Sequence, residues 1–301
     1  MTGDRLAIEA SGLTKRYGDV TAVRDLTFTV RPGAVTGFLG PNGAGKTTTM
    51  RMLTGLVTPT SGTATIGGQP YGRLAQPSRT VGAVFDGNAF HPGHTARDHL
   101  GVYAAMAGCP DSRVAELLDL LGLAQAADRR TREFSTGMRR RLSLATALLG
   151  DPRVLLLDEP SNGLDPEGMS WLRGLLRRLA DEGRTVLVSS HVLHEVQQVV
   201  DDVVVIRRGV LVAAGPWSRL TGPSTVLVTS PDATDLAAAL TAGTGSVEPA
   251  GPGRLRVRGL DAPRVADLAA DHRLRIHELV TETTSLEQLF LDLTTDTAEA
   301  R

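Results

Sequence analysis

Short apolar runs alternate with segments of helical periodicity through the first two thirds of the chain. Five runs have the length and composition of strands: Ala34–Leu39, Val81–Phe85, Val154–Leu157, Thr185–Ser189 and Val203–Arg207. Val154–Leu157 is apolar at every position, which is typical of a parallel strand covered by helices on both faces. We expect helices from Thr47 to Leu53, over Gly168–Glu182 and over His191–Asp201. This alternation predicts an α/β fold with a parallel sheet.

Two further segments complete the first part of the chain. Ile8, Val20–Val23 and Leu26–Val30, separated by glycine-containing turns, predict strands of an antiparallel edge. From Thr95 to Gly150 the apolar residues recur at helical spacing, so a helical subdomain is expected over about residues 90–150.

The composition changes near Thr221-Gly222-Pro223, which predicts a domain of residues 1–221 and a smaller one of residues 222–301. In the second part the patterns predict strand, helix, strand, strand, helix and strand, the ferredoxin-like order. The expected segments are Thr225–Thr229, Asp232–Thr241, a short strand near Val247, Leu255–Val257, Pro263–Ala270 and Leu274–Leu279. A last helix is expected from Ser285, with an apolar stripe that packs on its own domain.

Composition narrows the function classes. The 301 residues are 41% hydrophobic and 22% charged, enough for packed cores. The formal net charge is −1, so no overall field attracts nucleic acid. Cys109 is the single cysteine, which excludes an internal disulfide. The apolar runs are far shorter than the roughly 18 residues of a membrane-spanning helix, and no signal peptide is evident.

Lysine is rare, and its placement is informative. Lys15 and Lys46 are the only lysines among the 32 lysine and arginine residues. Lys46 lies in a segment with the spacing G-x-x-x-x-G-K-[ST]. Glycines there let backbone N–H groups turn toward phosphate oxygens, and a compact ammonium reaches the β- and γ-phosphates. The chain is therefore expected to bind a nucleoside triphosphate, with Thr47 offering a hydroxyl to Mg²⁺. The candidate residues are Gly40, Pro41, Asn42, Gly43, Ala44, Gly45, Lys46, Thr47 and Thr48.

Two carboxylates follow the apolar strand Val154–Leu157. Asp158 and Glu159 stand at its C-terminal end. Beside a phosphate-binding loop, such a pair has separable roles: Asp158 holds the Mg²⁺ hydration shell, and Glu159 orients or deprotonates the attacking water.

With these motifs in order, residues 5–220 resemble the nucleotide-binding subunit of an ATP-binding cassette (ABC) transporter. Phe134-Ser135-Thr136-Gly137-Met138 is similar to the family signature, usually Leu-Ser-Gly-Gly-Gln. The resemblance implies that Ser135 and Gly137 contact the γ-phosphate bound by a second subunit. It also implies three further roles: Tyr17 stacks on adenine, Asp165 ends a loop that links two sites across a dimer, and His191 is the switch histidine at the γ-phosphate.

One position departs from the family pattern. After Val81–Phe85 the family usually has glutamine, and this chain has Asp86. A carboxylate ligates Mg²⁺ or accepts a hydrogen bond from water, but it lacks the amide donor. We expect Asp86 to contact Mg²⁺ or the attacking water.

The resemblance also implies partners. ATP joins two copies of the chain as a homodimer and its hydrolysis separates them, which drives a separate membrane permease that the region of about Phe90–Gly150 contacts. The chain then lies on the cytoplasmic face of the membrane. The segment Ser285–Thr294 resembles the end of drug-export ATPases of the daunorubicin-resistance type, so export of a drug, antibiotic or other hydrophobic compound is expected.

Other classes of nucleotide-binding protein fit the sequence less well. A soluble ABC ATPase acting on ribosomes or nucleic acid usually has two cassettes or a long coiled-coil insertion, whereas this chain has one cassette, no sustained heptads and no basic stripe. A P-loop GTPase or small-molecule kinase does not need Ser135–Met138 or the carboxylate pair, and the guanine-reading Asn-Lys-x-Asp is absent.

Overall fold

The computed structural model describes residues 6–85, 90–192, 196–220, 225–242 and 246–282. The chain forms two compact units, Met1–Pro216 and Trp217–Arg301. The division lies a few residues before the boundary that the sequence indicates near Thr221. Each unit has its own hydrophobic core.

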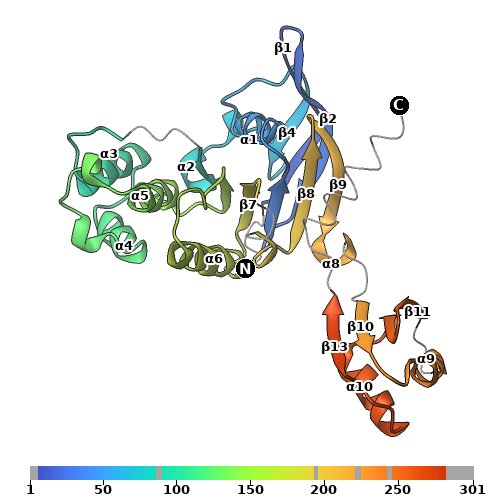
Figure 1. Ribbon diagram of the computed structural model, residues 1–301. Helices are drawn as coiled ribbons and strands as arrows, with labels where there is room; N and C mark the ends of the chain where they lie inside the picture. Colours follow the sequence, from blue (N-terminus) through green and yellow to red (C-terminus); the bar gives the residue numbers. More distant parts are fainter. Residues whose placement is uncertain (1–5, 86–89, 193–195, 221–224, 243–245, 283–301) are drawn as a thin grey trace, which may run out of the picture. The chain divides into compact units, whose positions relative to one another are not determined.

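A six-stranded sheet is the centre of the first unit (Figure 1). Its order is β5 (Val81–Val84), β6 (Val154–Leu157), β7 (Thr185–Ser190), β3 (Val35–Leu39), β8 (Asp202–Arg207) and β9 (Val210–Pro216). All neighbours are parallel except β8 and β9. Every residue of β3, β6 and β7 is buried, as is expected of parallel strands that are covered on both faces. The parallel sheet is therefore confirmed, whereas the half-exposed antiparallel strand β9 was not predicted.

A second sheet forms the antiparallel edge. It contains β2 (Val20–Val30), β1 (Ile8–Tyr17) and β4 (Ser61–Ile66) in that order. The runs Val20–Val23 and Leu26–Val30 form one strand, in which Asp25 has a φ of 47° where the register shifts. The helix α1 (Lys46–Leu53) shares one core with both sheets, because Met50, Leu13 and Phe38 belong to the same buried cluster. This core fixes the start of α1 against the end of β3.

The region between β5 and β6 is helical, as expected. It contains α3 (Ala96–Ala107), α4 (Ser112–Leu120) and α5 (Thr136–Leu148), with short 3₁₀ turns at Ala124–Ala126 and Thr131–Glu133. Thr95 and Asp98 form a capping box at the start of α3. Two shorter elements precede β5, the 3₁₀ turn Tyr71–Arg73 and α2 (Pro77–Thr80).

The helix expected over Gly168–Glu182 is α6 (Pro166–Asp181), which covers the sheet beside β7. The helix expected over His191–Asp201 is wrong at both ends. His191 lies in a bend, residues 196 and 197 have helical geometry, residues 198 and 199 form a turn, and the helix does not extend to Asp201. Residues 193–195 lie outside the described part. Val196, Val199 and Val200 have helical spacing and are buried, although they do not form a continuous helix.

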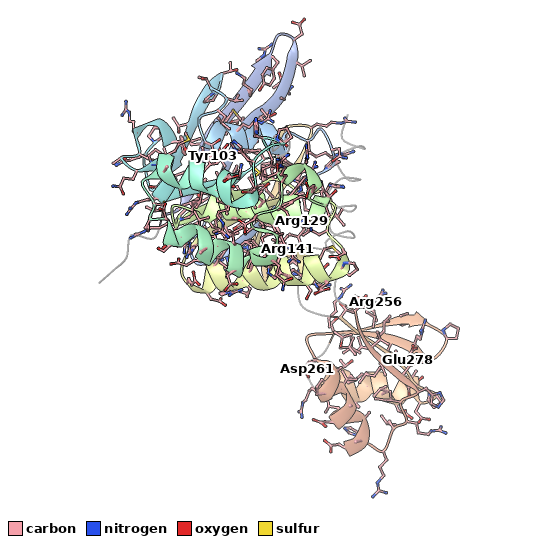
Figure 2. The ribbon with its side chains drawn as sticks, turned by 90° about the vertical axis from the view of Figure 1, so that its left-hand side faces the viewer. Tyr103, Arg129, Arg141, Arg256, Asp261 and Glu278 are labelled. Carbon is pink, nitrogen blue, oxygen red and sulfur yellow. The ribbon has the colours of Figure 1, made fainter. Side chains whose placement is uncertain are left out.

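The second unit has a four-stranded antiparallel sheet in the order β11-β12-β10-β13. The strands are β10 (Thr225–Thr229), β11 (Ser246–Gly251), β12 (Arg254–Arg258) and β13 (Glu278–Glu282), with helices α9 (Ala233–Ala242) and α10 (Ala262–Asp271) and the short α8 (Trp217–Leu220) before them. The predicted ferredoxin-like order is confirmed. Arg256 of β12 and Glu278 of β13 lie in this sheet (Figure 2). Each makes an ion pair across the intervening strand β10, Arg256 with Glu282 and Glu278 with Arg254.

Two expectations for this unit differ from the structure or fall outside it. The last strand begins at Glu278 and not at Leu274, because Leu274 and Ile276 pack on the core as an irregular segment. The helix expected from Ser285 lies outside the described residues. Among the described helices of the chain, none has the length and hydropathy that crossing a membrane requires.

Candidate nucleotide site

The predicted phosphate-binding loop connects β3 to α1. Gly45 precedes the helix with a φ of 105°, and a Cβ there would lie 2.7 Å from the Ala22 carbonyl oxygen. Only glycine fits this backbone without strain. The helix begins at Lys46, so its N–H groups point toward the loop. The local fold is therefore the strand, loop and helix that anion binding requires.

The side chain of Lys46 is enclosed by the loop residues that precede it in the sequence. Its side chain is 6% exposed, and Nζ donates to the Gly40 oxygen at 2.7 Å. Nζ also lies 3.2 Å from Glu159 Oε1. A buried ammonium needs such partners. The loop cation and the predicted base are thus in direct contact.

The two carboxylates lie at the C-terminal end of β6, as predicted. Asp158 is 1% exposed and accepts a hydrogen bond from Thr47 Oγ1 at 2.7 Å. Glu159 Oε2 lies 2.8 Å from His191 Nδ1. His191 itself follows β7, the next parallel strand. The carboxyl ends of β6 and β7 therefore bring Asp158, Glu159 and His191 to the P-loop.

These groups line one cleft of about 390 Å³. Its lining contains most of the predicted P-loop residues, both carboxylates and the histidine. The residues are Ala22, Asn42, Gly43, Ala44, Gly45, Lys46, Thr47, Thr48, Asp158, Glu159, Asn162 and His191. Gly40 and Pro41 take part through their carbonyl oxygens, which accept from Lys46.

The signature residues lie elsewhere. Ser135 caps α5 by accepting from the Met138 N–H, and Asp165 caps α6 by accepting from the Gly168 N–H at 2.8 Å. Ser135, Gly137 and Asp165 line a different hollow on the same unit, and none of its lining residues is shared with the P-loop cleft. Arg129 and Arg141 add positive charge to this hollow (Figure 2).

Tyr17 stands at the end of β1, outside the lining of the cleft. Its side chain is exposed at 50%, and Lys15 Nζ lies 4.9 Å from the ring centroid while donating to the Thr58 oxygen. Lys15 covers one face of this exposed ring, and the other face could stack on a planar group such as adenine. The role of Tyr17 in binding adenine stays a prediction. Asp86 lies outside the described residues, so its role also stays a prediction.

The donor set at the cleft suits Mg²⁺. Thr47 Oγ1 and Asp158 Oδ2 are hard oxygen ligands, and they already lie 2.7 Å apart. In the described part of the chain, no group of three or more His, Cys, Asp or Glu side chains is arranged to hold a metal. Mg²⁺ is commonly bound by one or two protein oxygens together with substrate phosphates. The residues present therefore fit Mg²⁺ accompanying a triphosphate, and do not fit a metal held by protein alone.

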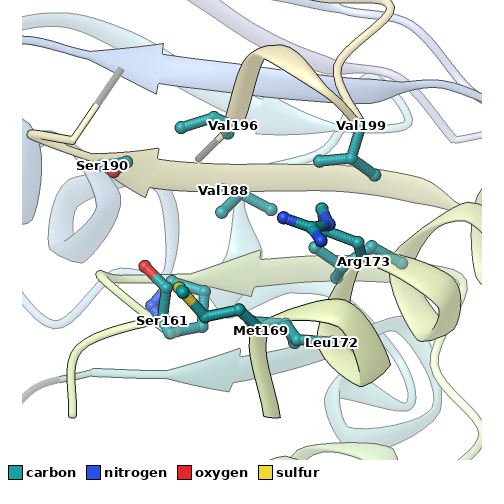
Figure 3. A pocket seen from close by; sticks show the side chains of 10 residues that line it. Ser161, Met169, Leu172, Arg173, Val188, Ser190, Val196 and Val199 are labelled. Carbon is teal, nitrogen blue, oxygen red and sulfur yellow. The ribbon is translucent and has the colours of Figure 1, made fainter. Parts of the chain in front are cut away.

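A small apolar cavity lies between α6, the end of β7 and the segment of residues 196–199 (Figure 3). It is lined by Met169 and Leu172 of α6, Val188 of β7 and Val199, with Arg173 reaching into it. Its volume is about 30 Å³, which is room for no more than a few water molecules. The cleft at the P-loop is the larger of the two and contains the charged groups.

One buried residue at the site has no counterpart among the predicted ones. Ser189, at 0% exposure, bonds to Asp158 and to the backbone of Glu159. Its signal in the sequence is weak: it stands two residues before His191, and alternate residues of a strand share a face.

Comparisons with known proteins identify the family of the chain. The family model described as ABC transporter matches residues 23–162, and a model of a domain of unknown function matches residues 224–287. The uncharacterized ABC transporter ATP-binding protein YhcH of Bacillus subtilis is 34% identical over 98% of this chain and 98% of its own length. The chain belongs to the ATP-binding subunits of ABC transporters.

Two more similarities concern the first unit. The bacitracin transport ATP-binding protein BcrA of Bacillus licheniformis is 41% identical over 71% of each chain. A solved ATP-binding subunit of an ABC transporter matches with a TM-score of 0.65 and 26% identity over 71% of this chain and 91% of that one. This ABC subunit is accordingly an ATPase coupled to transport, and its fold is the ABC ATPase fold.

Proposed function

We propose that the chain hydrolyses Mg²⁺-bound ATP between two of its own copies and powers a separate membrane permease for the export of an antibiotic or other hydrophobic compound. The observation that carries the proposal is the separation of the two half-sites. Lys46, Glu159 and His191 line one cleft, while Ser135 and Gly137 line another hollow of the same unit. A second copy, related by two-fold symmetry, brings its signature to the first copy's P-loop.

The cleft residues have distinct roles in this proposal. The N–H groups of the P-loop and Lys46 bind the phosphates. Mg²⁺, when bound by Thr47 and Asp158 with the phosphates, neutralises charge that develops on the transferred group. Glu159 orients the attacking water and accepts its proton on the carboxylate. His191 Nδ1 lies 2.8 Å from the Glu159 carboxylate and lines the same cleft, from which it would contact the γ-phosphate.

The helical region supplies a surface for the permease. Val102, Tyr103 and Met106 of α3 are exposed at 48%, 43% and 78%, and they lie within about one turn of each other (Figure 2). Neighbouring exposed apolar side chains are typical of protein interfaces. The permease holds the subunit at the cytoplasmic face of the membrane.

The transported class is proposed from similarity. BcrA is by its name a bacitracin transport subunit, and it is 41% identical over 71% of this chain. The direction of transport follows from the resemblance to drug-export ATPases. We assign no particular compound.

The experiment uses Glu159→Gln in the full chain. With the base removed and the phosphate contacts kept, MgATP should shift this variant from monomer to dimer in size-exclusion chromatography, and turnover should fall by at least about 100-fold. Glu159→Gln combined with Lys46→Ala is the control and should stay monomeric. Full turnover by Glu159→Gln, or turnover by a wild-type chain that stays monomeric, would contradict the proposal.

Co-purification tests the partner. From cells that contain its native membranes, the chain should be recovered with a membrane protein of several spans. Recovery with ribosomes or nucleic acid, and with no membrane protein, would instead support the soluble class of ABC ATPases.

A further inference from the structure

Ser189 forms hydrogen bonds with both acidic residues of the candidate site, with the carboxylate of Asp158 and with the backbone of Glu159. It is the fifth residue of β7 and is 0% exposed. Its Oγ is 2.6 Å from Asp158 Oδ1 and 2.9 Å from the Glu159 backbone nitrogen. One hydroxyl group on the neighbouring strand therefore contacts both adjacent acidic residues.

The chemistry of the partners fixes the direction of each bond. An ionised carboxylate only accepts, and a backbone N–H only donates. Ser189 Oγ–H therefore donates to Asp158 and accepts from Glu159. The other oxygen of Asp158 accepts from Thr47 at 2.7 Å. Asp158 is thus held at both oxygens, by the P-loop helix on one side and by β7 on the other.

The bond to Glu159 restrains an unfavourable backbone. Glu159 has a φ of 48°, in the left-handed region that a residue with a side chain adopts only when its surroundings hold it there. In this conformation its carboxylate reaches Lys46 at 3.2 Å and His191 at 2.8 Å. Rotation of the Glu159 backbone to the usual φ would aim the carboxylate elsewhere.

We propose that Ser189 is a positioning residue of the ATPase site: its hydroxyl orients Asp158 toward the Mg²⁺ position beside Thr47 and holds Glu159 in the conformation that presents its carboxylate to the cleft. This inference rests on the proposed ATPase function and deepens it. Ser189 does not line the P-loop cleft, whereas Asp158 and Glu159 do. Ser189 acts through these two residues.

The test compares two buried serines with the same set of hydrogen bonds. Ser230, at 2% exposure in the second unit, donates to the Arg275 oxygen at 2.6 Å and accepts from the Asp232 N–H at 3.0 Å. Ser189→Ala and Ser230→Ala each remove one donor and one acceptor from a buried place, so both should lower the melting temperature. Only Ser189→Ala should affect the nucleotide site.

The readout is the affinity for ATP with Mg²⁺ and with EDTA, measured by calorimetry on the full chain. Ser189→Ala should weaken MgATP binding by about 10-fold or more, in the range seen when a residue that orients a metal ligand is lost. Binding of ATP in EDTA should change by less than about twofold. Turnover should show a lower kcat in addition to the higher KM. Ser230→Ala should leave all of these values at the wild-type level.

A second variant guards against loss of folding. Ser189→Cys keeps the connectivity of the side chain, with a larger atom and a weak S–H donor in place of the hydroxyl, so its MgATP affinity should lie between wild type and Ser189→Ala. The inference is overturned if Ser189→Ala or Ser189→Cys folds and binds MgATP as wild type does, with only a lower melting temperature. Failure of the ATPase function itself is a separate result, because the wild-type chain would then show no turnover.

Discussion

His99, at the residue scale, is a titratable group whose surroundings set its charge. It is 7% exposed, packs on the rings of Phe90 and Tyr103, and lies 3.1 Å from Thr146 Oγ1 through Nε2. Thr146 donates its own proton to the Leu142 oxygen at 2.9 Å, so it accepts from His99. The hydrogen of the neutral ring is therefore on Nε2. Burial, with a smaller contribution from His94, lowers the pKa of His99 from 6.5 to about 4.

This shift predicts a dependence of stability on pH. Because the folded pKa lies below the unfolded one, the unfolded state takes up a proton first as the pH falls. The free energy of unfolding should then decrease between pH 6.5 and 4, by about 2–3 kcal/mol in total, and be fully present above pH 6.5. Urea unfolding at several pH values measures it. His99→Asn should remove this part of the pH dependence.

An exposed histidine offers the control for that series. His272→Asn, at the end of α10, shows the effect on the free energy of unfolding of replacing an exposed histidine by asparagine. The assignment for His99 is contradicted if His99→Asn keeps the wild-type slope.

At the scale of elements, β5 and α5 pack closely because Gly82 of β5 has no side chain. A Cβ on Gly82 would overlap the Ala147 carbonyl oxygen of α5 and lie 2.8 Å from Pro152 Cγ. Gly82→Ala should therefore push α5, which carries the signature at its start, away from the sheet. We expect a loss of about 1–3 kcal/mol in the free energy of unfolding, the usual cost of overpacking.

The matched control for Gly82 is Gly174, an exposed glycine within α6. No atom lies within 4 Å of its ideal Cβ. Gly174→Ala should raise the free energy of unfolding by about 0.5–1 kcal/mol, because alanine favours the helix. Equal effects of the two substitutions in urea unfolding would show that the contact between β5 and α5 is not close.

Element-scale prediction from sequence succeeded where a signal is local. The runs that became β3, β6 and β7 are buried at every position, and each contains enough Val, Leu or Phe to give a local apolar signal. β4 was missed because its exposed half consists of small and polar residues, and β9 because its apolar run of residues 210–212 is short and not fully buried. The helix predicted over His191–Asp201 is too long at both ends, because the helical spacing of the buried Val196, Val199 and Val200 continues beyond the residues that have helical geometry.

The residues of the candidate site, like the elements, could be predicted from the sequence only where the signal is local. The P-loop, the carboxylates and His191 follow from short spacings, and the structure brings them to one cleft. The hydrogen bonds of Ser189 join positions about thirty residues apart, between neighbouring strands. Such a pairing depends on the strand order β6-β7, which local spacing does not contain.

At the scale of the whole molecule, each of the two units has a hydrophobic core made of its own described residues. The cluster that unites β1, β2, β3 and α1 lies within Met1–Pro216, and the cluster of Val226, Leu236, Leu255 and their neighbours lies within Trp217–Arg301. The composition change near Thr221 indicates this organisation. A unit that buries its own core is expected to fold alone.

A chain of residues 1–216 should therefore fold and keep the nucleotide site. All residues that line the P-loop cleft lie between Ala22 and His191, so the affinity for MgATP should agree with that of the full chain within about twofold, the scatter expected for distant sites. Calorimetry on both chains measures this, with Lys46→Ala in each as the control that abolishes tight binding. If the shorter chain fails to unfold cooperatively, or binds MgATP more than about 10-fold less tightly, the second unit contributes to the site and the two units are not energetically independent.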